Sequence, residues 1–138
     1  MIVIIRIRGS VKTRGEVEET LFRIRLRRKY ACVVLQDSKN LNGILKHVRD
    51  YVAYGTISET ILEKLIAQRG QAIDKTKKIE PKKVAEGFNK GKRWESMNVK
   101  PFFRLHPPRK GIKSKLHYPQ GALGNHGTEI IKLLDRML

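Results

Sequence analysis

The sequence has 138 residues, and its 30 Lys and Arg against 13 Asp and Glu give a formal net charge of +17. The length predicts one compact domain, with or without an appendage, and 40% hydrophobic residues suffice for a core, which excludes a disordered chain. A folded chain with this charge repels itself unless a polyanion neutralises it, and nucleic acid is the polyanion that we expect.

The positive charge is concentrated in two segments. Residues 1–30 carry nine basic and three acidic side chains, and residues 71–120 carry fourteen basic and four acidic ones. The rest of the chain is close to neutral. These two segments are therefore where we expect contacts with a polyanion.

Hydropathy and cysteine content indicate a cytoplasmic protein with no membrane partner. The longest apolar run, residues 30–35, is far too short to span a bilayer. Arg6 and Arg8 interrupt the N-terminal apolar stretch, which argues against a signal peptide. The single cysteine, Cys32, lies within the apolar run and is predicted to fill the core, as is usual in a reducing compartment.

A strand, a loop and a helix are predicted for the first part of the chain. Residues 1–8 alternate, which predicts a strand with Arg6 and Arg8 on its outer face. Residues 9–15 are predicted to form a loop. A helix from residue 16 has acids in its first turn and arginines toward its end, which suits the helix dipole. Its apolar stripe is Val17, Leu21 and Ile24.

Two more strands and a second helix complete a β-α-β-α-β order. Residues 30–36 and 51–54 predict strands, and turn residues at 37–40 precede a helical stripe. That stripe is Leu41, Ile44, Leu45 and Val48. The order predicts an α/β fold in which a small sheet has helices on one face, an open α/β or ferredoxin-like arrangement with residues 1–55 as its core.

Residues 56–138 are predicted to form a basic C-terminal extension that packs on the core and on the polyanion. A third helix begins after Ser58 and ends at Gly70, with an apolar face of Leu62, Leu65 and Ile66 and with Ile57 packed on Leu62. Residues 71–100 are rich in lysine and carry one helix signal, at 81–91, so both a helix and an extended arm stay open.

The end of the chain predicts one more strand and one more helix. Residues 102–105 are a strand candidate, and residues 107–127 form a long segment rich in Pro and Gly. Residues 128–138 predict a helix that docks on the core. Its docking residues are Ile131, Leu134 and Leu138.

The loop at residues 9–15 is a candidate phosphate contact. It combines glycine flexibility with Lys12 and Arg14 at the start of a helix, where unpaired backbone N–H groups favour phosphate. Together with residues 27–29 it is predicted to form one basic rim. A solvated surface turn is the alternative interpretation.

The segment from residue 90 to residue 118 interleaves cations with rings, a mixture that suits RNA. Cations meet phosphates, whereas exposed rings such as Trp94, Phe102 or Tyr118 can stack on splayed bases. Phe103 alternates with Arg104, as a buried residue of a strand would. We therefore favour a core position for Phe103 over a role in stacking on bases.

Catalysis is not expected. Residues 121–127 are rich in glycine and precede a predicted helix, as a phosphate-binding loop would. Their glycine spacing does not match a nucleotide-binding motif. Contact with an RNA backbone or a tight structural turn is the favoured interpretation. The four histidines and one cysteine show no metal-ligand spacing. A nuclease using His106 and His126 as acid and base is a less favoured alternative. We expect no enzyme, cofactor, metal or small-molecule substrate.

Two motifs carry a resemblance to a known family. Residues 105–111 (LHPPRKG) and 121–127 (GALGNHG) are similar to the archaeal and eukaryotic branch of the ribosomal protein L-thirty family. Residues 4–9 (IIRIRG), 26–28 (LRR), taken as the end of the first helix, and 50–55 (DYVAYG) also resemble its pattern. The resemblance therefore covers essentially the whole chain.

The resemblance implies three antiparallel strands and two helices that dock on large-subunit ribosomal RNA, beside other ribosomal proteins, with 5S ribosomal RNA as a further candidate. Bacterial members end near the equivalent of Gly55, whereas this chain continues. It lacks the long basic segment that precedes the first strand in eukaryotic members, so we expect an archaeal type. A free-standing RNA-binding regulator is the alternative.

Residue by residue, the family's RNA contacts fall on Ser10, Lys12 and Arg14, on Arg27 and Arg28, and on residues 106–109. Lys110 stands where the resemblance leads us to expect glycine. The full predicted RNA-binding set is Arg6, Arg8, Ser10, Lys12, Arg14, Arg27, Arg28, Lys29, Lys92, Arg93, Arg104, His106, Pro107, Pro108, Arg109, Lys110, Lys113, Lys115, His117, Asn125 and His126.

Overall fold

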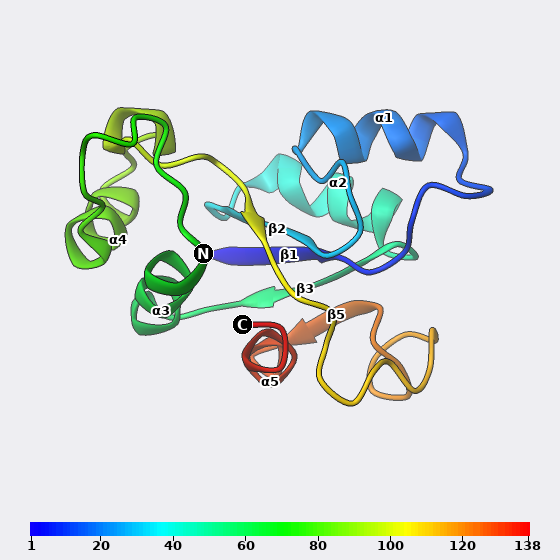
Figure 1. Ribbon diagram of the computed structural model, residues 1–138. Coiled ribbons are helices and arrows are strands. Elements are labelled where there is room, and N and C mark those ends of the chain that lie inside the picture. Colours follow the sequence, from blue (N-terminus) through cyan, green and yellow to red (C-terminus); the bar gives the residue numbers. More distant parts are fainter.

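A computed structural model describes all 138 residues, and one five-stranded sheet organises them (Figure 1). The strands are β1 (Ile2–Arg6), β2 (Ala31–Leu35), β3 (Val52–Thr56), β4 (Phe103–Arg104) and β5 (Gly124–Gly127). Their order is β4-β2-β1-β3-β5. β5 runs parallel to β3, and all other neighbours are antiparallel. The predicted β-α-β-α-β order is confirmed for the first three strands.

Five α-helices and one 3-10 helix connect and cover the strands. They are α1 (Gly15–Arg23), α2 (Lys39–Val48), α3 (Glu59–Arg69), α4 (Pro81–Asn89), η1 (Trp94–Met97) and α5 (Ile130–Asp135). Ser58 and Gly70 flank α3 as predicted, although the Ser58 hydroxyl contacts Thr60 Oγ1 rather than a backbone N–H. None of these helices has both the length and the apolarity needed to cross a membrane.

Helices cover both faces of the sheet: the two helices of residues 1–55 pack on one face, as predicted for this core, and helices of the extension cover the other. Ile2 and Ile4 of β1 belong to an 11-residue core with α1 and α2. Val3 and Ile5 belong to a 23-residue core with α3, α4 and α5. Figure 1 shows α1 and α2 on one side of the sheet and α3 and α5 on the other. The extension supplies the second layer, which is why every residue of β1 is buried.

The lysine-rich segment contains a packed helix, α4, as its helix signal predicted. Val84, Ala85 and Phe88 of α4 are buried. The rings of Phe88 and Trp94 stack with their centroids 4.4 Å apart, and Trp94 meets Phe103 edge to face at 5.6 Å. Trp94 is therefore a core residue and not a platform for RNA bases. The favoured core position of Phe103 is confirmed.

Boundaries differ from prediction at both ends of the chain. Helix α1 ends at Arg23, because Arg25 takes a left-handed backbone conformation with φ of 65°. Arg27 and Arg28 therefore lie in a loop beyond the helix. At the C-terminus helix α5 spans Ile130–Asp135 instead of residues 128–138. Leu134 is buried, and Ile131 and Leu138 are partly buried against the core, so the predicted docking is confirmed.

The last strand, β5, was not predicted. Its sequence, Gly-Asn-His-Gly, has no strand propensity and is extended because it pairs with β3. The approach is close at Gly55, where a Cβ atom would lie 2.1 Å from the Gly127 carbonyl oxygen. The extension therefore completes the sheet as well as covering it.

The predicted core position of Cys32 is confirmed. Its side chain is fully buried in the larger core. Burial raises the pKa of the Cys32 thiol far above its ordinary value, so the group stays protonated and unreactive in the folded protein.

Candidate nucleic-acid interface

The strand register gathers the predicted basic loops at one end of the sheet. β1 ends at Arg6, opposite the start of β3 at Val52. Ala31, which begins β2, pairs with Arg104 at the end of β4. The loops that follow β1 and precede β2 therefore emerge side by side. We call this the basic end of the sheet.

Arg6 is buried at this end, and the predicted outer position is wrong. Its side chain is 1% exposed, and its guanidinium donates four hydrogen bonds. It reaches the carbonyl oxygens of Leu26 at 2.7 Å, Arg27 at 3.1 Å and Arg8 at 3.0 Å, and Ser10 Oγ at 3.1 Å. Arg6 thus ties the loop after β1 to the loop after α1. It positions two basic segments and does not itself face a ligand.

Burial also changes the pKa of Arg6. Desolvation lowers the pKa of its guanidinium below the ordinary value, and the nearby Glu18 carboxylate partly opposes this shift. An arginine begins from so high a pKa that it stays cationic. The guanidinium therefore remains charged inside the fold, and its N–H groups donate to oxygen atoms of the protein.

A groove of about 660 Å³ opens beside these loops, between the end of α1 and β4. It has a floor of Ala31 and Leu105, three aromatic rings and six cations. The rings are Phe22, Tyr30 and Phe102, and the cations are Arg23, Arg25, Arg27, Arg28, Lys29 and Arg104. We call it the arginine groove. Sequence reasoning identified Arg27, Arg28, Lys29 and Arg104 of this set.

Three of the cations lie against the rings. The guanidinium carbon of Arg27 is 4.0 Å from the centre of the Phe22 ring, and Lys29 Nζ is 4.8 Å from that of Tyr30. The guanidinium carbon of Arg104 is 5.9 Å from the centre of the Phe102 ring. The face of an aromatic ring attracts a cation without neutralising it. The rings therefore hold these charges in place and leave them available.

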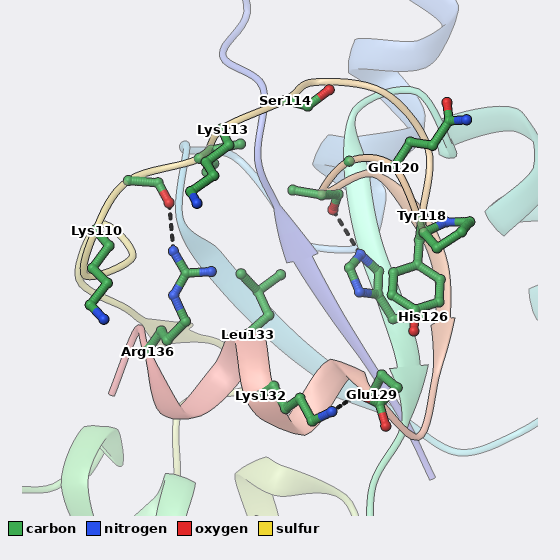
Figure 2. A pocket seen from close by; sticks show the side chains of 15 residues that line it. Lys110, Lys113, Ser114, Tyr118, Gln120, His126, Glu129, Lys132, Leu133 and Arg136 are labelled. Carbon is green, nitrogen blue, oxygen red and sulfur yellow. Dashed lines mark hydrogen bonds and ion pairs between the residues drawn. The ribbon is translucent and has the colours of Figure 1, made fainter.

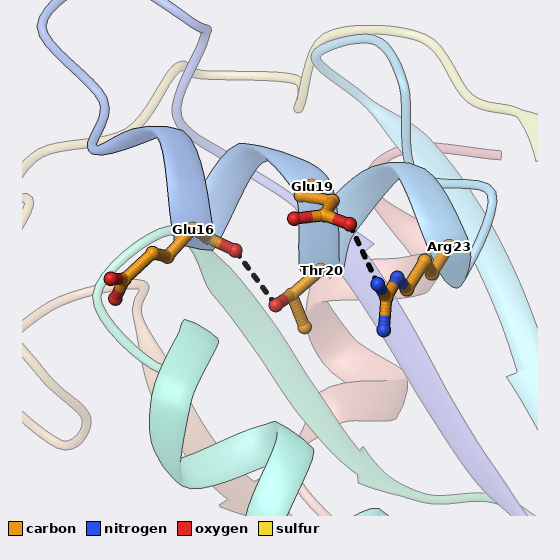
Figure 3. Close-up of polar contacts among 4 residues, drawn as sticks. All are labelled: Glu16, Glu19, Thr20 and Arg23. Carbon is orange, nitrogen blue, oxygen red and sulfur yellow. Dashed lines mark hydrogen bonds and ion pairs between the residues drawn. The ribbon is translucent and has the colours of Figure 1, made fainter.

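Two other cations of the groove are already neutralised. Figure 3 shows the i,i+4 pair of Glu19 and Arg23 on α1, with 2.6 Å between carboxylate and guanidinium. Arg25 pairs with Glu95 at 3.0 Å. Arg27, Arg28, Lys29 and Arg104 have no acidic partner. These four are the free charges of the groove, which we call the unpaired cations.

A second hollow extends the basic surface. Arg23 and Arg25 also line an adjoining groove, whose other wall includes Lys92 and Arg93 from the segment before η1. Both of these residues are exposed. The structure thus brings Lys92 and Arg93 next to Arg23 and Arg25, although more than 60 residues separate the two pairs along the chain.

The loop after β1 exposes most of its predicted contacts. Arg8, Ser10, Lys12 and Arg14 are all exposed. Lys12 takes a left-handed backbone conformation with φ of 57° at the turn. Because Arg6 fixes the start of this loop through Ser10, its cations are held near those of the arginine groove.

The C-terminal basic segment forms a separate hollow, the C-terminal pocket, of about 480 Å³ (Figure 2). Its residues come from 110–114, 118–122, 126 and α5 with the residues that precede and follow it. The Arg136 guanidinium donates to the carbonyl oxygens of Arg109 at 2.7 Å and Gly111 at 2.6 Å. Lys110 adopts φ of 65°, so the chain makes the bend with lysine where glycine was expected.

Several predicted contacts of this segment face inward or are occupied. His126 is 8% exposed, with Nε2 2.9 Å from the Ala122 carbonyl oxygen and its ring 4.6 Å from that of Tyr118. Pro108 is buried. His117 Nε2 lies 2.8 Å from Asp50 Oδ1. The His126 ring is thus held within the fold, where it lines the C-terminal pocket.

The other predicted residues of the segment are on the surface. The exposed members are His106, Pro107, Arg109, Lys110, Lys113, Lys115 and Asn125. Hydrogen bonds from the backbone N–H groups of His106 and Arg109 to the Met137 and Arg136 carbonyl oxygens, both 3.0 Å, fix the start of the segment on the end of the chain. It is thus held on the fold.

Sequence reasoning missed Phe22 and Tyr30. Phe22 directly follows the buried Leu21 and is 54% exposed, so it lies off the apolar face of α1. An aromatic residue off the apolar stripe, next to a run of arginines, was the signal that could have identified it. Tyr30 was assigned to the second strand, and no feature of the sequence indicated that it lines a groove.

Comparisons with known proteins show which family the chain resembles. Residues 2–52 match the family model described as Ribosomal protein L30p/L7e. The large ribosomal subunit protein uL30 of Archaeoglobus fulgidus is 40% identical over 153 aligned positions, which cover 99% of each chain. The chain belongs to the ribosomal protein L30p/L7e family. The proteins of the same name from Methanocella arvoryzae and Aeropyrum pernix are 39% and 37% identical over at least 97% of either chain.

The family resemblance seen in the sequence is confirmed, including its archaeal character. The archaeal relatives align over almost their whole length, so they share the C-terminal extension. The family model ends at residue 52, and it includes Phe22 and Tyr30 but not Phe102 or Arg104. The arginine groove is therefore built jointly by the segment that the family model covers and by the extension.

Proposed function

We propose that this chain is a structural constituent of the large ribosomal subunit, where it binds and stabilises large-subunit ribosomal RNA in the cytoplasm. The names of its archaeal relatives support the assignment to the large subunit. The proposal assigns no catalytic step, cofactor or small-molecule substrate. Neighbouring ribosomal proteins are further partners, and 5S ribosomal RNA is a candidate ligand.

The observation that carries the proposal is the group of unpaired cations. Arg27, Arg28, Lys29 and Arg104 line one groove without an acidic partner. Gathering like charges costs free energy, which a polyanion recovers. A phosphodiester backbone offers regularly spaced negative charges, and the counterions that it releases on binding add to the driving force.

The proposed contact surface is smaller than the set predicted from sequence. It comprises Arg8, Ser10, Lys12, Arg14, Arg27, Arg28, Lys29, Lys92, Arg93 and Arg104 around the basic end, with His106, Pro107, Arg109, Lys110, Lys113, Lys115, His117 and Asn125 as a second group. Arg6, Pro108 and His126 are buried and leave the contact set. Their proposed role is to position the loops that carry the contacts.

Sucrose-gradient sedimentation of a lysate from the source organism, probed for this protein, tests the proposal. We expect it to migrate with the large subunit at moderate salt and to be released at high salt, because phosphate contacts weaken as salt rises. Migration at the top of the gradient at low salt would refute a ribosomal role and favour a free-standing RNA-binding regulator.

A further inference from the structure

An exposed phenylalanine stands among the unpaired cations of the arginine groove. Phe22 is 54% exposed although it lines a groove with six basic side chains. Phosphates are bound by the cations, and an apolar ring makes no direct contact of its own with a phosphate. The ring does offer a flat apolar face, which is what a nucleobase removed from its helical stack requires.

The rings of the groove converge from distant parts of the chain. Phe22 belongs to α1, Tyr30 precedes β2, and Phe102 precedes β4. All three cation–ring pairs of the protein involve these rings. The guanidinium carbon of Arg27 lies 4.0 Å from the centre of the Phe22 ring, and both aromatic rings and guanidinium groups stack on bases. The groove thus combines stacking surfaces with charges that are held ready for the flanking phosphates.

The size and floor of the groove suit the same ligand. Its volume of about 660 Å³ lies within the range of roughly 300 to 1,000 Å³ that is usual for sites of small organic ligands. Ala31 and Leu105 give it an apolar floor. A double helix presents its phosphates outward and keeps its bases stacked, so it would leave this floor and these rings unused.

We infer that the arginine groove binds an unpaired base of the RNA, stacked on Phe22 and its neighbouring rings, while Arg28, Lys29 and Arg104 hold the adjacent phosphates. This inference rests on the proposed function and specifies its ligand as a bulged or looped nucleotide. The base is recognised by its flat face, so the groove accepts all four bases with modest preference.

The experiment compares two RNA duplexes with the purified protein. One duplex carries a single bulged 2-aminopurine at its centre, and the other has the same flanking sequence without the bulge. We expect the bulged RNA to bind about tenfold more tightly, since stacking of one base on an aromatic side chain has an effect of this order. The fluorescence of 2-aminopurine should fall as the base stacks.

Two variants identify the ring as the cause. Phe22→Leu keeps an apolar side chain but removes the aromatic face, and it should abolish the tenfold preference while the salt dependence of binding stays unchanged. Ile73→Ala, a change of another exposed apolar side chain, serves as the matched control and should preserve the preference. Thermal melting of both variants verifies that they fold.

The outcomes separate this inference from the proposed function. Equal affinity for both duplexes, or a preference that survives in Phe22→Leu, overturns the inference of a base site and leaves RNA binding intact. Failure of the folded protein to bind either duplex at low salt overturns both. A polyglutamate peptide that displaces the bulged RNA at equal charge concentration would assign the groove to an acidic protein instead.

Discussion

The arginine groove and the C-terminal pocket are both basic, but they differ in what their cations already bind. In the groove, Arg27, Arg28, Lys29 and Arg104 have no acidic partner. In the pocket, Lys132 pairs with Glu129, and Arg136 donates to two backbone carbonyl oxygens. Lys132 and Arg136 therefore serve partly to hold the fold together, whereas the unpaired cations of the groove are free for a ligand.

The comparison teaches that charge counted along a sequence is a poor measure of charge available for binding. Residues 71–120 have the larger excess of basic side chains. The free charges backed by aromatic rings nevertheless belong mainly to residues 22–30. Contacts made within the fold, rather than composition, decide which cations can meet phosphate.

The largest effect is expected at Arg6, which supports the edge of the groove from inside. Arg6→Ala leaves the carbonyl oxygens of Leu26 and Arg27 without their buried donor. We expect a loss of about 3 kcal/mol in the free energy of unfolding, measured by chemical denaturation. Arg6→Lys, which keeps the charge but not the planar fork, should recover only part of it. A loss below about 1 kcal/mol would show that Arg6 does not tie the loops together.

The next effect concerns the docking of the extension, which completes the groove. In Gly55→Ala the new methyl group would lie 2.1 Å from the Gly127 carbonyl oxygen, so β3 and β5 must separate. We expect a loss of about 2 kcal/mol, seen as a lower melting temperature. Unchanged stability would mean that β5 is only loosely attached to the sheet.

A matched pair of variants compares cations without an acidic partner with a cation that already has one. Arg27→Ala with Arg28→Ala should reduce the slope of log binding constant against log salt for RNA by about 2, because two phosphate contacts are lost. The melting temperature should barely move, since both side chains are exposed. Lys132→Gln, at a cation already paired with Glu129, should leave the slope unchanged. Equal effects of the two changes would remove the distinction between groove and pocket.

The smallest effect is expected at Gly43, and its substitution by alanine is a control for Gly55→Ala. Gly43 lies within α2, and a Cβ atom there meets nothing within 4 Å. Gly43→Ala should stabilise the protein by about 0.5 to 1 kcal/mol through helix propensity alone. A lower free energy of unfolding, measured by chemical denaturation, would contradict the open space around Gly43.

Much of the site could be predicted from sequence, because much of it depends on local patterns. Exposed loops with basic residues, such as the segment around Lys12 and Arg14, were recognisable without the fold. Phe22 and Tyr30 were not, since their role depends on Arg104 and Phe102 arriving from 70 or more residues away. Arg6 was misplaced because alternation alone does not show that α1, α2 and the loop after α1 cover the face that it shares with Ile2 and Ile4.

The β-α-β-α-β order, the buried position of Cys32 and the family could be predicted from the sequence, because hydrophobic periodicity and short motifs are properties of neighbouring residues. The pairing of β5, the coverage of both faces of the sheet and the identity of the free cations became known from the fold. Strand pairing and ion pairing join residues far apart in the chain, as Arg25 and Glu95 do. Such contacts leave no periodic signal, so they become visible only once the chain has folded.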